Sequence, residues 1–200
     1  MKLILASASP RRAELLRQAG IPFSIEIPDI TEEINGNISP QEAVTDLALK
    51  KALAVSSRLG EGFILAADTI VLHRGEVLGK PLDREDARQM LHRLSGNEHE
   101  VLTGLALVDA SSGKQESGFS LTRVWLKPLI KSEIDAYVAT GEPLDKAGAY
   151  GIQGRAALFV EKIEGCYFNV VGLPLNLLYD LMTSMQVPTW LNGKESDYVK

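Results

Sequence analysis

The sequence predicts an α/β fold with a central mixed β-sheet and flanking helices, and three observations support that class. Apolar runs typical of strands alternate with helical stretches through the first half of the chain. Two strand-like segments, 100–109 and 121–127, then follow one another around a Ser-Ser-Gly turn without an intervening helix. The chain has 200 residues, 45% of them hydrophobic, which suffices for one compact domain or for two small lobes. Alternating elements favour parallel strands and the strand pair favours antiparallel ones, so a mixed sheet is expected.

Local signals locate the elements of the first half. Ser9 and Pro10 are typical of an N-cap followed by the first helical residue. Ser39-Pro40 predicts the start of a second helix, and Gly60 predicts its end. The expected strands are 2–6, 23–27, 63–72 and 76–78, and the expected helices are 10–19, 40–59 and 83–94.

The second half contains a glycine-rich stretch between its predicted elements. After the strand pair, we expect helices at 132–140 and 174–185, a glycine-rich segment at 141–154 and a strand at 156–163. Residues after Val187 mix turn formers with charges. We therefore expect a single domain over residues 1–187 and a C-terminal tail over 188–200.

Composition excludes several classes of protein. The net charge of −5 argues against non-specific binding to nucleic acid, so an anionic substrate would need local basic residues. The single cysteine, Cys166, excludes an intrachain disulfide. No apolar run resembles a signal peptide or a membrane span, which predicts a cytoplasmic protein without nucleic-acid or membrane partners.

Basic and hydroxyl side chains crowd the start of the first helix. Ser7, Ser9, Arg11 and Arg12 surround a helix N-terminus, where backbone N–H groups favour an anion and arginine suits phosphate oxygens. A capped helix with two solvated arginines is the structural alternative.

Asp68 lies in a strand so apolar that a carboxylate there needs a partner. It could hold a metal ion or take a proton from water, and the alternative is a structural aspartate that accepts from backbone amides. Lys80 lies between Gly79 and Pro81 on a stiff loop, where it could contact phosphate. A P-loop is rejected because the glycine spacing is too short and proline replaces the hydroxyl residue.

Three further positions carry weaker signals. Glu32 and Glu33 follow the second strand, where paired acids are usually solvated. Lys50 and Lys51 are adjacent on a helix, so at most one faces a given site. The amide of Gln153, in the glycine-rich segment, could donate to and accept from a nucleobase edge. The histidines show no zinc-ligand spacing, so a hard cation held by oxygens is the only metal type favoured.

Seven motifs occur together in an order and spacing that resemble the Maf family of nucleotide pyrophosphatases. They are SASPRR at 7–12, ITEE at 30–33, AADTIV at 66–71, GKPLD at 79–83, LSG at 94–96, DKAGAYGIQG at 145–154 and VVGLPL at 170–175. The resemblance covers roughly residues 3–185. It implies a Maf/ITPase-like fold with two lobes around a deep cleft, a homodimer, and dependence on Mg²⁺ or Mn²⁺.

The resemblance also assigns roles to individual residues. Asp68 matches the catalytic acid and metal ligand of the family, and Glu32, rather than Glu33, matches a second acid. The phosphate-binding set falls on Ser7, Arg12, Lys51 and Lys80.

Three discriminating positions carry the substrate prediction. Family members that act on dTTP and UTP have the arginine, threonine and glutamine that stand here as Arg11, Thr69 and Gln153. We therefore expect a pyrophosphatase that converts dTTP and UTP, or modified pyrimidine nucleotides, to the monophosphate and pyrophosphate. The alternatives are a nucleotide-binding regulator of cell division or septum formation, and a phosphatase or nucleotidyl transferase that uses the same residues.

Overall fold

The computed structural model describes residues 2–30 and 38–189. Its strands are β1 (Leu3–Leu5), β2 (Phe23–Ile25), β3 (Phe63–His73), β4 (Glu76–Leu78), β5 (Glu98–Asp109), β6 (Gln115–Leu126) and β7 (Val160–Glu164). Its α-helices are α1 (Pro10–Gln18), α2 (Pro40–Leu59), α3 (Arg84–Leu94), α4 (Lys131–Ala139), α5 (Tyr167–Val171) and α6 (Leu175–Ser184). Three short 3₁₀ helices are η1 (Glu142–Asp145), η2 (Ala147–Ala149) and η3 (Arg155–Phe159).

The strands of the described residues form one mixed sheet, which confirms the predicted fold class. Their order is β2-β1-β3-β5-β6-β7, with β4 paired to β3. Strand β1 is parallel to both β2 and β3, whereas β3–β4 and β6–β7 are antiparallel pairs. Both kinds of pairing thus occur in one sheet, as the order of predicted elements indicated.

The chain divides into two compact units. Unit 1 contains residues 1–68, 103–119 and 172–200, and unit 2 contains residues 69–102 and 120–171. The division falls within β3, β5 and β6, so each of these strands contributes residues to both units. The predictions of a single domain over 1–187 and of a deep cleft stay predictions.

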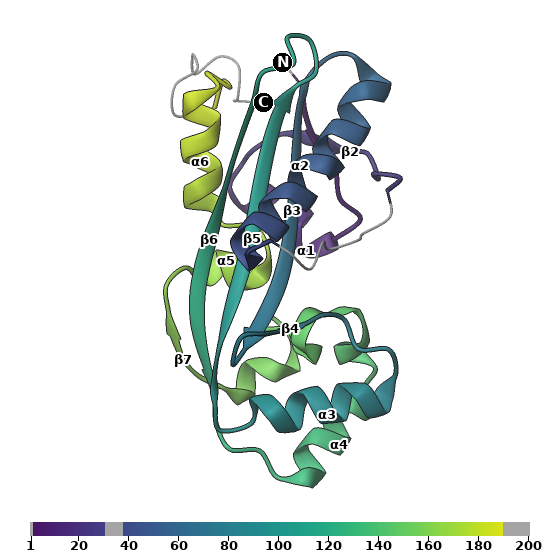
Figure 1. Cartoon of the computed structure of the whole chain (residues 1–200), viewed down its shortest axis with the longest axis vertical. Helices are drawn as coiled ribbons and strands as arrows, with labels where there is room; N and C mark the ends of the chain where they lie inside the picture. Colours follow the sequence, from purple (N-terminus) through teal and green to yellow (C-terminus); the bar gives the residue numbers. More distant parts are fainter. Residues whose placement is uncertain (1, 31–37, 190–200) are drawn as a thin grey trace. The chain divides into compact units, whose positions relative to one another are not determined.

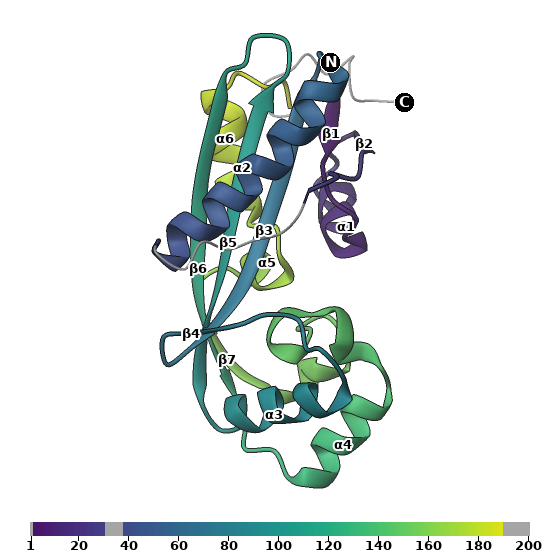
Figure 2. The same ribbon diagram turned by 45° about the vertical axis from the view of Figure 1, so that its right-hand side comes forward.

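In unit 1, helix α2 covers one face of the sheet. Ser39 caps α2 through a reciprocal capping box with Glu42, and Gly60 ends the helix in a left-handed conformation. Buried α2 residues pack on one alternating set of sheet residues. The α2 members are Ala48, Ala52 and Val55, and the sheet members are Ile4, Ile64, Ala66, Ala106 and Val108 from β1, β3 and β5, together with Ala6 just after β1. Figures 1 and 2 show α2 along one face of these strands and α6 on the opposite face. The apolar side chain of Leu53, also on α2, is exposed.

Gly104 of β5 allows α2 to approach the sheet very closely. A Cβ atom at this position would lie 2.3 Å from the carbonyl oxygen of Val44 and 2.7 Å from the backbone nitrogen of Thr45. Only glycine leaves room for the helix backbone there. The distance between α2 and β5 therefore depends on the absence of a side chain at residue 104.

Unit 2 has its own core, built by α3, α4, the 3₁₀ helices and the adjoining parts of the strands. Its buried members include Leu91 and Leu94 from α3, Ile134 and Val138 from α4, and Phe159 from η3. This unit contains β4, α3, α4 and β7, which Figure 1 labels. This core fixes the backbone that carries the glycine-rich segment.

Four predicted element boundaries or types were wrong. Strand β6 begins at Gln115, six residues before the predicted start at Leu121. Residues 155–159 form η3 rather than the start of a strand, and β7 begins only at Val160. Helix α4 begins at Lys131, with Ile130 as its N-cap residue, whereas the predicted helix begins at residue 132. The five-residue helix α5 was not predicted, because it is too short to show a helical period.

Two further predictions concern membrane-spanning segments and the C-terminal tail. Within residues 2–30 and 38–189, no helix is long and apolar enough to cross a membrane. Residues 190–200 of the predicted tail lie outside the described residues.

Candidate functional site

The central feature of unit 1 is a buried ion pair between Lys51 and Asp68. The Lys51 Nζ donates to Asp68 Oδ1 at 2.7 Å, and the two side chains are 7% and 11% exposed. Burial of either charge alone would cost several kcal/mol, on the order of 3–5, so each needs the other. The aspartate in the apolar strand is therefore held by a cation, whereas the structural alternative expected its partners to be backbone amides.

Strand alternation and helix packing explain this pair. Ile64 and Ala66 of β3 face α2, and Asp68 is the next residue on the same face. Lys51 precedes the buried Ala52 on α2, whereas Lys50 is exposed. The prediction that at most one of the two lysines faces the site is confirmed, and that lysine is Lys51.

A second cluster joins the first and last motifs of the chain. The Ser7 hydroxyl accepts from the backbone N–H of Ser9 at 3.1 Å and from Arg12 Nη1 at 3.2 Å. Arg12 Nε also donates to the carbonyl oxygen of Gly172 at 2.9 Å. These contacts fix the guanidinium of Arg12 in one orientation, so it is not a freely solvated arginine. Ser9 is the N-cap residue as predicted, although its side chain makes no capping hydrogen bond.

The parallel pairing of β1 and β3 relates the two clusters. Leu5 pairs with Leu65, and the N–H of Ala6 donates to Leu65 O at 2.7 Å. Ser7 therefore leaves β1 beside the part of β3 that leads into Asp68. The carboxyl ends of parallel strands are the usual location of ligand sites in α/β sheets.

Arg11 and Thr69 flank these clusters in the sequence. Arg11 is half-buried on the first turn of α1, next to Arg12. Thr69 follows Asp68 on β3, where alternation directs it to the opposite face, and it is half-buried.

The remaining predicted residues of the described chain lie in unit 2. Lys80 and Gln153 are both exposed. Their segments are joined by a backbone hydrogen bond, because the N–H of Gly148 donates to the carbonyl oxygen of Gly79 at 3.0 Å. The structure thus brings Ser7 together with Arg12 and Lys51 together with Asp68, and it links the backbone of the Lys80 loop to that of the Gln153 segment. Glu32 lies outside the described residues.

Asp68 provides the kind of ligand that a hard divalent cation prefers. Mg²⁺ and Mn²⁺ favour carboxylate oxygens, and Mg²⁺ is commonly bound by one or two carboxylates together with substrate phosphates. Among residues 2–30 and 38–189, no group of three or more His, Cys, Asp or Glu side chains could hold a metal ion. The Asp68 carboxylate is thus chemically suited to such an ion.

A buried polar pair in unit 2 was not predicted from the sequence. His99 Nε2 lies 2.7 Å from the hydroxyl of Tyr150, and the two rings meet edge to face. Burial, with a smaller contribution from the charge of His73, lowers the pKa of His99 to about 4. Burial also raises the pKa of Tyr150. His99 is therefore neutral at pH 7, and the pair anchors the middle of the glycine-rich segment.

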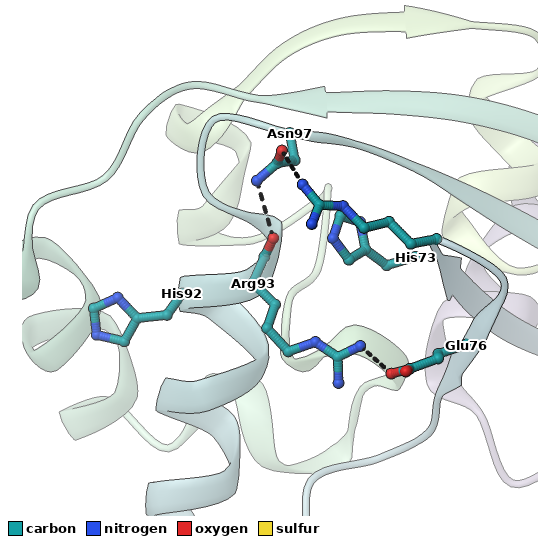
Figure 3. A pocket seen from close by; sticks show the side chains of 6 residues that line it. His73, Glu76, His92, Arg93 and Asn97 are labelled. Carbon is teal, nitrogen blue, oxygen red and sulfur yellow. Dashed lines mark hydrogen bonds and ion pairs between the residues drawn. The ribbon is translucent and has the colours of Figure 1, made fainter.

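A hollow of about 520 Å³ on unit 2 is lined by residues outside the seven motifs. It is lined by His73, Arg74, Glu76, His92, Arg93 and Asn97 (Figure 3). Arg93 is paired with Glu76, and Arg74 with the Asn97 side chain. None of the six lining residues is among the predicted site residues.

Comparisons with known proteins agree with the family resemblance that the seven motifs indicated. Residues 2–185 match the family described as Maf: Maf-like protein. A protein of Symbiobacterium thermophilum named dTTP/UTP pyrophosphatase is 53% identical over 193 residues, which is 96% of this chain and 98% of that protein. A protein of Carboxydothermus hydrogenoformans with the same name is 51% identical over 179 residues, 90% of this chain and 96% of that protein.

The fold also resembles a solved structure. The Staphylococcus aureus Ham1 protein matches with a TM-score of 0.50 and 12% identity, over 92% of this chain and 100% of that one. At that identity the likeness shows a shared fold alone, and it agrees with the predicted architecture. Because the family match spans nearly the whole chain and relatives share half of its residues, the chain belongs to the Maf family.

Proposed function

We propose that this chain is a nucleoside triphosphate pyrophosphatase that hydrolyses dTTP and UTP to the monophosphate and pyrophosphate. The observation that carries the proposal is the buried Lys51–Asp68 pair beside the Ser7–Arg12 cluster. A carboxylate and fixed cations are groups that can promote the attack of water on a phosphoanhydride. The relatives from Symbiobacterium and Carboxydothermus, both named dTTP/UTP pyrophosphatase, support the choice of reaction and substrate.

The proposed reaction is an in-line attack of water on the α-phosphorus. A bond forms between the water oxygen and the α-phosphorus, while the bond to the oxygen bridging the α- and β-phosphates breaks and pyrophosphate leaves. Asp68 orients the water and accepts its proton, which then passes to solvent. Lys51 holds the Asp68 carboxylate in one orientation through the 2.7 Å contact.

In the proposal, basic side chains and a divalent ion balance the charge on the phosphates. Arg12 is oriented by Ser7 and Gly172, so its guanidinium needs little reorganisation to bind phosphate oxygens. Lys80, exposed on its loop, supplies a further point charge in the proposal. A divalent ion, Mg²⁺ or Mn²⁺, bound by Asp68 and the proposed second ligand Glu32, would add positive charge against the phosphate oxygens.

Base recognition is assigned to Arg11, Thr69 and Gln153. The side-chain amide of Gln153 can both donate to and accept from the imide edge of thymine or uracil. A carboxylate at that position could only accept, and it would repel the pyrimidine carbonyls. The exposed position of Gln153 in unit 2 leaves its amide accessible to a ligand. We also propose that the protein acts as a homodimer in the cytoplasm.

A nucleotide panel tests the proposal. Pyrophosphate and orthophosphate release would be measured for dTTP, UTP, dCTP, purine triphosphates and modified pyrimidine nucleotides, with and without Mg²⁺. The proposal expects pyrophosphate from dTTP and UTP only when the metal ion is present. Orthophosphate as the product would indicate a phosphatase, and a purine preference would overturn the assignment of the three base-recognition residues. Binding of UTP without pyrophosphate release would favour the nucleotide-binding regulator instead.

A further inference from the structure

Gln153 lies on a tight turn in the glycine-rich segment. The N–H of Gly154 donates to the carbonyl oxygen of Gly151 at 3.0 Å, which closes a four-residue turn with Gln153 as its third residue. Gln153 is exposed at this position. The direction of its amide therefore depends on how firmly the two ends of the turn are held.

The carboxylate of Glu142 holds the C-terminal end of this turn. Glu142 Oε1 accepts from the backbone N–H of Arg155 at 3.0 Å and from the hydroxyl of Tyr137 at 3.1 Å. A Cβ atom at Gly154 would lie 2.0 Å from the same oxygen, so the carboxylate rests directly against the glycine backbone. Tyr137 is itself buried on α4, which gives the carboxylate a rigid second donor.

Lys146 holds the N-terminal end of the same turn. Its methylene groups cover Gly151, where a Cβ atom would lie 2.6 Å from Lys146 Cε. Its Nζ donates to the backbone carbonyl of Glu142 at 2.5 Å and to Asp145 Oδ1 at 2.6 Å. Glu142 and Lys146 are thus bonded to each other and contact opposite ends of the turn.

We propose that Glu142 and Lys146 are positioning residues for pyrimidine recognition, because together they fix the 151–154 turn that carries Gln153. Neither residue needs to touch the substrate in this role. The inference rests on the proposed function, since it assumes that Gln153 reads the base. It extends that function by naming two residues, outside the three base-recognition positions, that set the discrimination between pyrimidines.

The test compares Glu142→Ala, Glu142→Gln and a matched control, Glu133→Ala. Glu133 also lies in unit 2. Its carboxylate accepts from the backbone N–H of Ile130 at 3.0 Å and from the side chain of Lys127, and both partners lie outside the turn. Glu142→Gln keeps one oxygen acceptor for Arg155 and Tyr137, whereas Oε2, which also accepts from the Arg155 N–H at 3.2 Å, becomes an amide nitrogen. The variant therefore removes the charge and keeps the shorter hydrogen bond to Arg155.

The first measurement is the ratio of kcat/KM for dTTP to kcat/KM for dCTP. Glu142→Ala is expected to lower this ratio roughly 10- to 100-fold, the size of effect that a misplacement of about 1 Å can cause. Glu142→Gln and Glu133→Ala are expected to keep the ratio close to wild type. In a Gln153→Ala background, Glu142→Ala should cause no further loss, because its effect acts through Gln153. A general loss of folded protein would lower both rates and leave the ratio unchanged.

The second measurement does not depend on activity. Hydrogen exchange of the Arg155 backbone amide should be roughly 10-fold faster or more in Glu142→Ala, since a hydrogen bond to a charged group is lost, and unchanged in Glu133→Ala. An unchanged exchange rate, an unchanged dTTP/dCTP ratio, or independent effects of Glu142→Ala and Gln153→Ala would each overturn the positioning role. If wild-type protein cleaves neither dTTP nor UTP, the proposed function fails, and the exchange experiment still decides whether Glu142 holds the turn.

Discussion

Gly104→Ala is expected to destabilise unit 1 by forcing α2 away from the sheet. The new Cβ would lie 2.3 Å from the Val44 carbonyl oxygen and 2.7 Å from Thr45 N. Ordinary contact begins near 3.4 Å, so helix and strand must separate by about 1 Å. The atoms in the way belong to the backbone of a 20-residue helix, which cannot move aside as a flexible side chain can.

The cost follows from overpacking a close-packed interface. Such substitutions typically cost 1–3 kcal/mol, and we expect a loss of about 2 kcal/mol in the free energy of unfolding. For a chain of this size, that corresponds to a fall in Tm of roughly 4–8 °C. Because α2 also carries Lys51, separation of the helix should lengthen its 2.7 Å contact with Asp68 and lower kcat as well.

Urea unfolding of Gly104→Ala measures this loss, and Gly118→Ala is the matched control. Gly118 also lies on a strand of unit 1, but its Cβ would meet only the flexible end of Leu177, at 3.1 Å. The control should therefore be nearly neutral, or gain a few tenths of a kcal/mol from the restricted unfolded chain. Equal stability of the two variants would refute the claim that the close approach at Gly104 holds α2 in place.

Three further outcomes are expected. Lys51→Met should lower the free energy of unfolding by roughly 3–5 kcal/mol, because it leaves the Asp68 carboxylate buried without its cation. The pKa of His99, about 4 in the folded chain against 6.5 unfolded, means that the unfolded chain binds more protons in this range. Stability should therefore be lost as the pH falls from 6.5 towards 4, by about 3 kcal/mol more in wild type than in His99→Gln. Chelation of divalent ions should abolish pyrophosphate release, and added Mg²⁺ should restore it.

Each of these outcomes has a direct check. The double variant Lys51→Met/Asp68→Asn should be more stable than Lys51→Met alone, and strictly additive effects would contradict the ion-pair explanation. Parallel pH profiles of wild type and His99→Gln, measured by urea unfolding, would contradict a neutral buried His99. Full activity in excess chelator would contradict a metal-dependent reaction.

Local signals were sufficient for most of the fold. The capping box at Ser39, the left-handed Gly60 and the apolar run of β3 each act within a few residues, so the sequence shows them directly. The first half of β6 was missed because Gln115–Ser120 lacks apolar alternation, and this segment gains its conformation from pairing in the sheet. Helix α5 depends on its neighbours in the same way, since five residues cannot form a stable isolated helix.

The candidate site was predictable by residue type but not by geometry. The apolar context of Asp68 indicated that it needed a partner, yet only the packing of α2 on β3 identifies that partner as Lys51. The role of Glu142 could not be recognised in the sequence, because its contacts with Gly154 and Arg155 span a dozen residues of irregular chain. His99 was likewise unrecognised, since nothing in a strand sequence shows which histidine is buried against a tyrosine.

Asp68 is the group that we propose accepts a proton from the attacking water. The most direct test is the rate of pyrophosphate release from dTTP by Asp68→Asn, which keeps the shape of the side chain but removes its basicity. The control is Asp135→Asn, a carboxylate of unit 2 paired with Arg88 and Lys131. We predict a fall in kcat of roughly 10²–10⁴-fold for Asp68→Asn, with near-wild-type turnover in the control. Near-native turnover by folded Asp68→Asn would contradict the proposed mechanism.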